Sequence, residues 1–170
     1  MTRVYLPATL ATLADAVVAG RLEAGHAAHA VTPAIREWYV EGDVEELEYA
    51  AMTDAAQASL RLLAAELDTP ERYANRRVVI SAEVDSDAVA VHQDEHFRSA
   101  VRQTREIPMA TVVSVHVDAQ DDQAVRAAVA DAVLSLPAAD GGDDDARFVL
   151  DEAEATELLW YDVSELGDLV

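Results

Sequence analysis

Arg77-Val78-Val79-Ile80-Ser81-Ala82-Glu83-Val84 is the segment that indicates the fold most clearly. It is rich in β-branched residues, which fit the pleated and half-buried surface of a strand. A run of this length after a polar loop predicts a central strand. Val112-Val113-Ser114-Val115-His116-Val117-Asp118 has the same character and predicts a second one. The chain is therefore expected to be organised around a β-sheet.

The longest helix is expected directly before the first of these strands. Asp43 is followed three residues later by Glu46, which is the reciprocal pair of a capping box. Two adjacent apolar lines continue from there to about Leu67 and make one broad apolar face. We therefore expect this helix to be well buried, and Asp68-Thr69-Pro70 to end it.

Shorter elements continue the alternation of strands and helices. For residues 85–106 a strand near Phe97 to Arg105 is favoured, with a helix as the alternative, and the glycines and aspartates of residues 138–146 predict a flexible acidic loop. The whole chain, residues 1–170, is predicted to be one α/β or α+β domain in which helices cover a mixed sheet. Further strands are expected at residues 3–6, 29–31, 147–150 and 158–161, and further helices at 9–20, 32–42, 123–136 and from Ser164 onward.

The charge of the chain excludes several classes of partner. With 12 basic against 33 acidic side chains, its formal net charge is −21. Nucleic-acid binding draws most of its affinity from cations against phosphates, so no nucleic-acid partner is expected, and anionic lipid is disfavoured in the same way. No signal peptide is expected, because the residues that follow Met1 do not form its long apolar core, and no stretch approaches the roughly 20 apolar residues of a membrane-spanning helix. We expect a cytoplasmic protein whose partner is a basic protein, a cation or a neutral small molecule.

No cofactor is predicted. The absence of cysteine excludes a disulfide framework, an iron–sulfur cluster, a thiolate zinc site and a cysteine nucleophile. The sequence also has no glycine-rich loop of the kind that binds phosphate groups. It has no catalytic-triad pattern of serine, histidine and an acid in which the serine stands in a glycine-flanked turn.

Several short motifs of the sequence occur together in a known family. They are Val4-Tyr5-Leu6-Pro7-Ala8-Thr9, Thr32-Pro33-Ala34-Ile35-Arg36-Glu37-Trp38-Tyr39, Ser114-Val115-His116-Val117-Asp118 and Glu157-Leu158-Leu159-Trp160-Tyr161-Asp162. In this order they resemble a small uncharacterised family of actinobacterial proteins, a domain of unknown function, over nearly the whole chain. The resemblance implies a stand-alone cytoplasmic domain and brings no activity, ligand or catalytic residue.

One motif has the spacing of a metal site. His92-Gln93-Asp94-Glu95-His96 fits H-x-x-E-H, which on a helix places two imidazoles one turn apart with the glutamate as general base. On a strand the same histidines would be roughly 13 Å apart and could not share an ion. The sequence favours a solvated polar loop here, with a metal site at His92, Glu95 and His96 as the alternative.

The candidate binding site consists of aromatic and polar residues from the motifs quoted above. Each stands near the end of a predicted element, so loops could bring them together at one sheet edge, where open sheets bind ligands. The alternative is that one tryptophan and one tyrosine belong to the core, with their polar atoms bonded to the backbone. The candidate residues are Glu37, Trp38, Tyr39, His116, Asp118, Trp160 and Tyr161.

These observations favour a non-catalytic interaction or small-ligand-binding module over an enzyme. A metal-dependent hydrolase that uses His92, Glu95 and His96 is the second hypothesis. A third is an accessory subunit whose acidic surface meets a basic partner.

Overall fold

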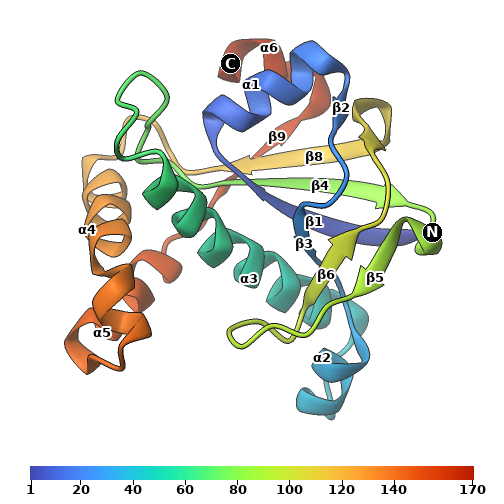
Figure 1. The fold of residues 1–170 in the computed structure, drawn as a ribbon, viewed down its shortest axis with the longest axis horizontal. Coiled ribbons are helices and arrows are strands. Elements are labelled where there is room, and N and C mark those ends of the chain that lie inside the picture. Colours follow the sequence, from blue (N-terminus) through green and yellow to red (C-terminus); the bar gives the residue numbers. More distant parts are fainter.

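The two strands expected at residues 77–84 and 112–118 lie side by side in a seven-stranded sheet of the computed structural model, which describes all residues from Met1 to Val170 (Figure 1). The order of the sheet is β5-β6-β3-β1-β4-β8-β9, and β2 pairs with β7 in a small second sheet. The strands are β1 (Thr2–Ala8), β2 (Arg21–Leu22), β3 (Ala27–His29), β4 (Val78–Val84), β5 (Val89–Val91), β6 (Ala100–Gln103), β7 (Ile107–Pro108), β8 (Val112–Val117) and β9 (Leu159–Asp162). The α-helices are α1 (Leu10–Ala19), α2 (Pro33–Trp38), α3 (Val44–Ala65), α4 (Gln123–Asp140), α5 (Asp144–Glu154) and α6 (Leu166–Leu169).

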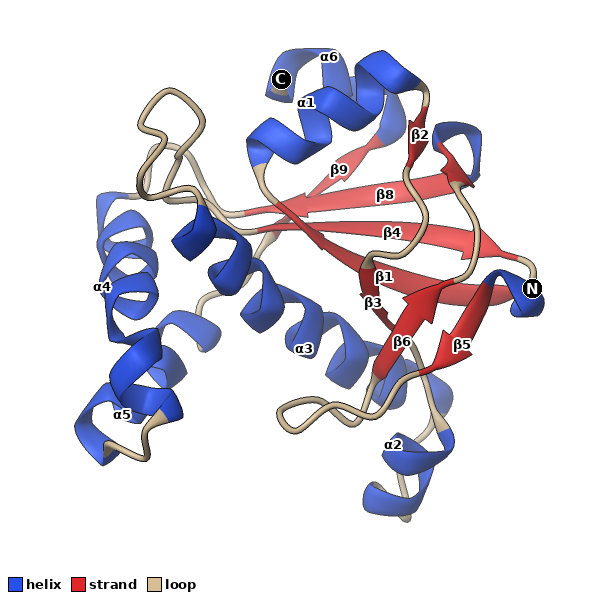
Figure 2. Ribbon diagram, viewed as in Figure 1, coloured by secondary structure: helices blue, strands red, loops and turns tan.

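The fold class is confirmed, since helices and one large sheet form a single α+β domain (Figure 2). The expectation of mixed strand directions is wrong, because every neighbouring pair of strands is antiparallel. The helices α2 and α3 connect β3 to β4, which run in the same direction but lie on either side of β1. Insertion of the N-terminal strand between them removes the parallel pair that the alternation suggested.

Each face of the sheet has its own apolar core. One core joins alternate residues of β1, β4 and β8 to Leu13 of α1, Ile107 of β7 and Leu166 of α6. On the other face Tyr5 and Val79 pack against α2 and the alanine-rich side of α3. The C-terminal half of α3 continues past the sheet and packs against α4 and α5. The well-buried long helix expected from residue 43 onward is thus confirmed.

The flexible acidic loop expected at residues 138–146 is wrong. The helix α4 continues through Pro137 to Asp140, and α5 begins at Asp144, so only a short turn separates them. Gly142 makes this turn with a φ of 92°, a conformation that favours glycine. The carboxylate of Asp143 then accepts a hydrogen bond from the Ala146 N–H at 2.8 Å and caps α5. The acidic run therefore begins a helix, where negative charge is favourable.

The strand expected at residues 147–150 is wrong for the same reason, since these residues belong to α5. Ala146, Leu150 and Ala153 follow a helical period and are buried against α4 and α3. The short apolar run Phe148-Val149-Leu150 does not distinguish a strand from a buried helix turn. The strand favoured at Phe97 to Arg105 is confirmed over Ala100–Gln103.

The hydroxyl of Ser59 connects α3 to the sheet. It donates to the carbonyl oxygen of Ala8 at 2.7 Å and accepts from the N–H of Val78 at 3.1 Å, and all three groups are buried. We expect Ser59→Ala to lower the free energy of unfolding by about 2 kcal/mol, because two buried backbone groups lose their partner. Urea denaturation measures this, with Ser135→Ala in α4 as control; equal effects of the two substitutions would contradict the prediction.

No helix of the structure has both the length and the apolar character needed to cross a membrane.

Candidate functional site

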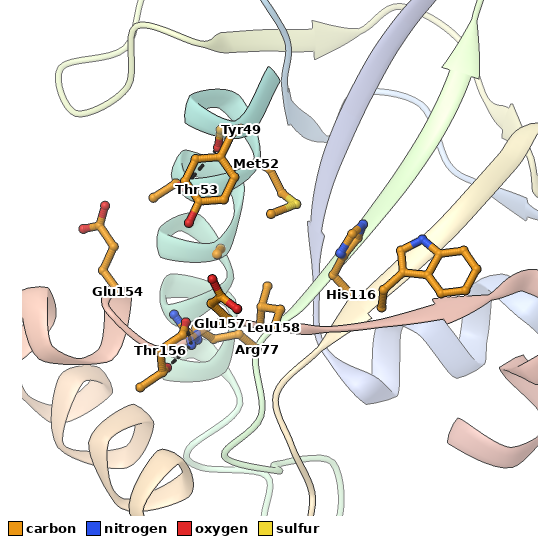
Figure 3. Close-up of a pocket in the computed structure, with 11 residues that line it drawn as sticks. Tyr49, Met52, Thr53, Arg77, His116, Glu154, Thr156, Glu157 and Leu158 are labelled. Atoms are coloured by element: carbon orange, nitrogen blue, oxygen red, sulfur yellow. Dashed lines mark hydrogen bonds between the residues drawn. The ribbon is translucent and has the colours of Figure 1, made fainter. Parts of the chain in front are cut away.

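A cavity of about 300 Å³ lies where α3 leaves the sheet uncovered (Figure 3). The helix packs on β3, β1 and β4, whereas β8 and β9 extend beyond it on the same face. The cavity is enclosed by α3, by β8 and β9, and by the chain that connects α5 to β9. The side chains that matter most for its chemistry are Tyr49, Met52, Arg77, His116, Glu154, Thr156, Glu157, Leu158 and Trp160.

The register of β8 and β9 brings His116 and Trp160 together. They are directly opposite in the antiparallel pair, and opposite residues lie on the same face of a sheet. Their neighbours Val115 and Val117 point to the other face and are fully buried in the core. Because β9 is the outermost strand, Trp160 keeps 59% of its surface exposed. The cavity therefore has an imidazole on its sheet side and an accessible indole at its edge.

His116 is uncharged at neutral pH. Burial lowers the pKa of its imidazole below the ordinary value, and Nε2 lies 3.2 Å from the Ser114 hydroxyl. No carboxylate is hydrogen-bonded to the ring, so a serine–histidine–acid arrangement is not assembled. His116 offers the cavity a neutral polar group.

The only arginine of the cavity wall is already neutralised. The Asp118 carboxylate accepts hydrogen bonds from Arg77 Nε at 2.9 Å and Nη2 at 2.7 Å, and both side chains are buried. Nη2 also donates to the Thr156 hydroxyl at 2.6 Å and to the Thr156 carbonyl oxygen at 3.2 Å. This network fixes the α5–β9 connection against β4.

Carboxylates therefore determine the charge of the cavity. Glu154, the last residue of α5, and Glu157, on the α5–β9 connection, stand at its rim. Loss of surrounding water raises the pKa of Glu154, the neighbouring Asp151 raises it further, and Arg77 lowers it. With Arg77 paired and His116 neutral, no free positive charge offsets these acids. The cavity combines aromatic and aliphatic walls with a negative rim.

Comparison with protein-family models identifies the family of the chain. A model for a family of unknown function, DUF6912, matches residues 2–170. The chain belongs to this family. This match confirms the expectation that the chain belongs to an uncharacterised domain family. Searches among curated proteins and among solved structures give no match.

The DUF6912 fold divides the candidate binding residues among separate places. His116 and Trp160 share the cavity, but Trp38 and Tyr39 line another cavity of about 80 Å³ at α2. Both tryptophans are more than half exposed, so the alternative of a core tryptophan is wrong. Glu37 is exposed on α2.

Asp118 and Tyr161 do not line the cavity that His116 and Trp160 share. Asp118 is completely buried in its pair with Arg77. Tyr161 lies opposite Val115 and packs against the core on the other face of the sheet. The one-residue alternation of a strand thus separates Tyr161 from Trp160.

The residues of the H-x-x-E-H motif lie in a loop between β5 and β6 rather than on a helix. Asp94 forms the turn by accepting from the N–H groups of His96 and Phe97 at 2.8 and 3.1 Å. His92 and Glu95 line one surface cavity, which His96 does not line. No group of three or more histidine and acidic side chains is close enough to hold a metal ion. The geometry therefore gives the hydrolase hypothesis no assembled site.

Several cavity residues were missed by sequence reasoning. Tyr49, Met52 and Ala56 lie at helical spacing on α3. Met52 and Ala56 belong to the apolar lines that predict a buried helix face, and Tyr49 lies outside those lines. Thr156 and Leu158 lie between α5 and β9 and have no periodic signal. Their role depends on the pairing of β9 with β8.

Proposed function

We propose that this protein binds a small organic cation in the cavity between α3 and the β8–β9 edge. The observation that carries the proposal is the combination of exposed aromatic walls with carboxylates and no free positive charge. Aromatic faces attract quaternary and primary ammonium groups through their negative π surface, and carboxylates at the rim add charge attraction.

The charge of the whole molecule supports the same chemistry. A net charge of −21 raises the local concentration of cations around the protein and repels anionic ligands. The apolar wall formed by Met52 and Leu158 suits a ligand whose cationic head carries methyl or methylene groups. The protein acts in this proposal as a binding module, without a covalent step.

Choline and its uncharged isostere, in which a tert-butyl group replaces the trimethylammonium group, provide the test. We expect choline to bind with the higher affinity in titration calorimetry. Trp160→Ala should weaken choline binding by roughly 5- to 30-fold, because a cation–π contact contributes about 1–2 kcal/mol. Added salt should weaken binding as well.

Trp38→Ala is the matched control, since Trp38 is as exposed as Trp160 but lies outside this cavity. Its choline affinity should equal that of the unmodified protein. Equal binding of choline and the uncharged isostere, or equal losses in the two tryptophan variants, would exclude the proposal.

A further inference from the structure

The junction between α2 and α3 exposes large apolar side chains next to one another in the sequence. Trp38 is 61% and Val40 86% exposed, and Tyr39 and Val44 are exposed as well. We call these four residues the corner patch. Figure 1 shows α2 at one extremity of the molecule, below the sheet in that view. Single exposed apolar residues are ordinary, but a contiguous group marks an interaction surface.

The corner patch is held in place by its own contacts. The guanidinium carbon of Arg98 lies 3.8 Å from the ring centre of Trp38, which fixes the indole in position. The Gly42 N–H donates to the Tyr39 carbonyl oxygen at 3.2 Å and closes the turn. An added Cβ at Gly42 would lie 3.2 Å from Leu47 Cδ2 and 3.3 Å from Tyr39 Cβ, so the turn is closely packed. A surface that is already ordered loses little side-chain entropy on binding.

The patch also has a recess. The cavity of about 80 Å³ beside Trp38 and Tyr39 is lined by Asp54 of α3. One carboxylate oxygen of Asp54, Oδ2, accepts a hydrogen bond from the Ser99 hydroxyl at 2.6 Å. Arg98 and His96 line the same recess, so Asp54 already has a basic neighbour there. The recess therefore adds shape to the patch, and the attraction for a basic partner comes from the exposed carboxylates around it.

The rim of the patch is mostly acidic, although the exposed Arg36 precedes it in the sequence and Arg98 lies against Trp38. In the segment from residue 37 to residue 46 the only charged side chains are five carboxylates, all exposed. An apolar centre inside a charged rim is the usual anatomy of a protein interface, and tryptophan and tyrosine dominate its energetics. A second copy of this chain would bring the same acidic rim and a charge of −21, so it is repelled. The rim residues are Glu37, Glu41, Asp43, Glu45 and Glu46.

We infer that the corner patch docks an amphipathic segment of a basic protein partner. Apolar side chains of that segment cover Trp38, Tyr39 and Val40, and its arginine or lysine side chains meet the acidic rim. This surface is separate from the cation cavity, since no residue of the corner patch lines that cavity. The two sites can therefore be tested independently.

A synthetic amphipathic helix of leucine and arginine is the probe. Trp38 and Trp160 are the only tryptophans, so in Trp160→Phe the fluorescence reports on the corner patch alone. We expect a saturable change in Trp38 fluorescence that requires both the leucines and the arginines of the peptide. Val40→Ser, at a position that is 86% exposed, should weaken binding about tenfold in the Trp160→Phe background.

Phe148→Ala in the same background is the matched control, because Phe148 is 63% exposed on α5, outside the corner patch. It should leave the affinity unchanged. The inference is overturned if the Trp38 fluorescence does not respond, or if Phe148→Ala weakens binding as much as Val40→Ser. It is also overturned if a peptide with serine in place of leucine binds equally well, or if sedimentation shows self-association that Val40→Ser abolishes.

Discussion

Asp118→Ala is expected to lower the free energy of unfolding by about 3–5 kcal/mol, because it leaves the buried guanidinium of Arg77 without its counter-charge. The Asp118 carboxylate also accepts from the Arg77 backbone N–H at 2.7 Å, in addition to its two side-chain bonds. These contacts join the beginning of β4 to the end of β8. Urea denaturation of the variant and the unmodified protein measures the loss.

The exposed pair of Arg105 and Asp87, 2.8 Å apart, provides the control. Asp87→Ala should change the free energy of unfolding by less than about 1 kcal/mol, since solvent screens such pairs. If Asp118→Ala and Asp87→Ala lowered the free energy of unfolding by similar amounts, the buried pair of Arg77 and Asp118 would contribute no more to stability than an exposed pair. The double variant Arg77→Met with Asp118→Leu should recover much of the stability, because it removes both buried charges.

The second large effect is a loss of stability on acidification caused by His29. Burial lowers the pKa of His29 to about 4, and the nearby Asp94 raises it only in part. An unfolded histidine has a pKa of about 6.5, so between these values the unfolded chain binds a proton that the folded chain does not. Stability therefore falls as the pH decreases from about 6.5 to about 4. The shift corresponds to about 3 kcal/mol at the acid end of this range.

Denaturation at a series of pH values measures this slope. His29→Gln should flatten it, whereas His26→Gln, at an exposed position, should leave it unchanged. The His29 ring lies 2.7 Å from the Ser99 hydroxyl, which donates to Asp54. Burial raises the pKa of Asp54, so Asp54 contributes a slope of opposite sign, because its stabilising contribution is lost as the pH rises. Parallel curves for His29→Gln and the unmodified protein would contradict the assignment to His29.

Local pattern was sufficient where an element is stabilised by residues close in sequence. The capping box of Asp43 and Glu46 starts α3 as expected, with hydrogen bonds of 2.9 and 3.1 Å. The β-branched run at residues 78–84 forms β4. Asp143 is also a typical residue for the start of a helix, but the glycines before it favour a loop when the sequence is considered alone.

The candidate site depends on contacts that no local pattern contains. His116 and Trp160 meet only because β9 pairs with β8 in a register that places them opposite each other. A shift of that register by one residue would put Tyr161 in the cavity and Trp160 against the core. Asp118 looked like a surface candidate at the end of a strand, yet the approach of Arg77 makes it a buried structural acid.

The amino-acid sequence is sufficient for the family, the α+β class, the positions of the long helix and the main strands, and the negative net charge. These properties follow from composition and from periodicities of two and 3.6 residues, which act over a few neighbouring residues. The antiparallel order of the sheet, the cavity at its uncovered edge and the exposure of both tryptophans become apparent only in the folded structure. Those properties depend on which distant segments become neighbours, and the free energy of that choice is distributed over the whole core.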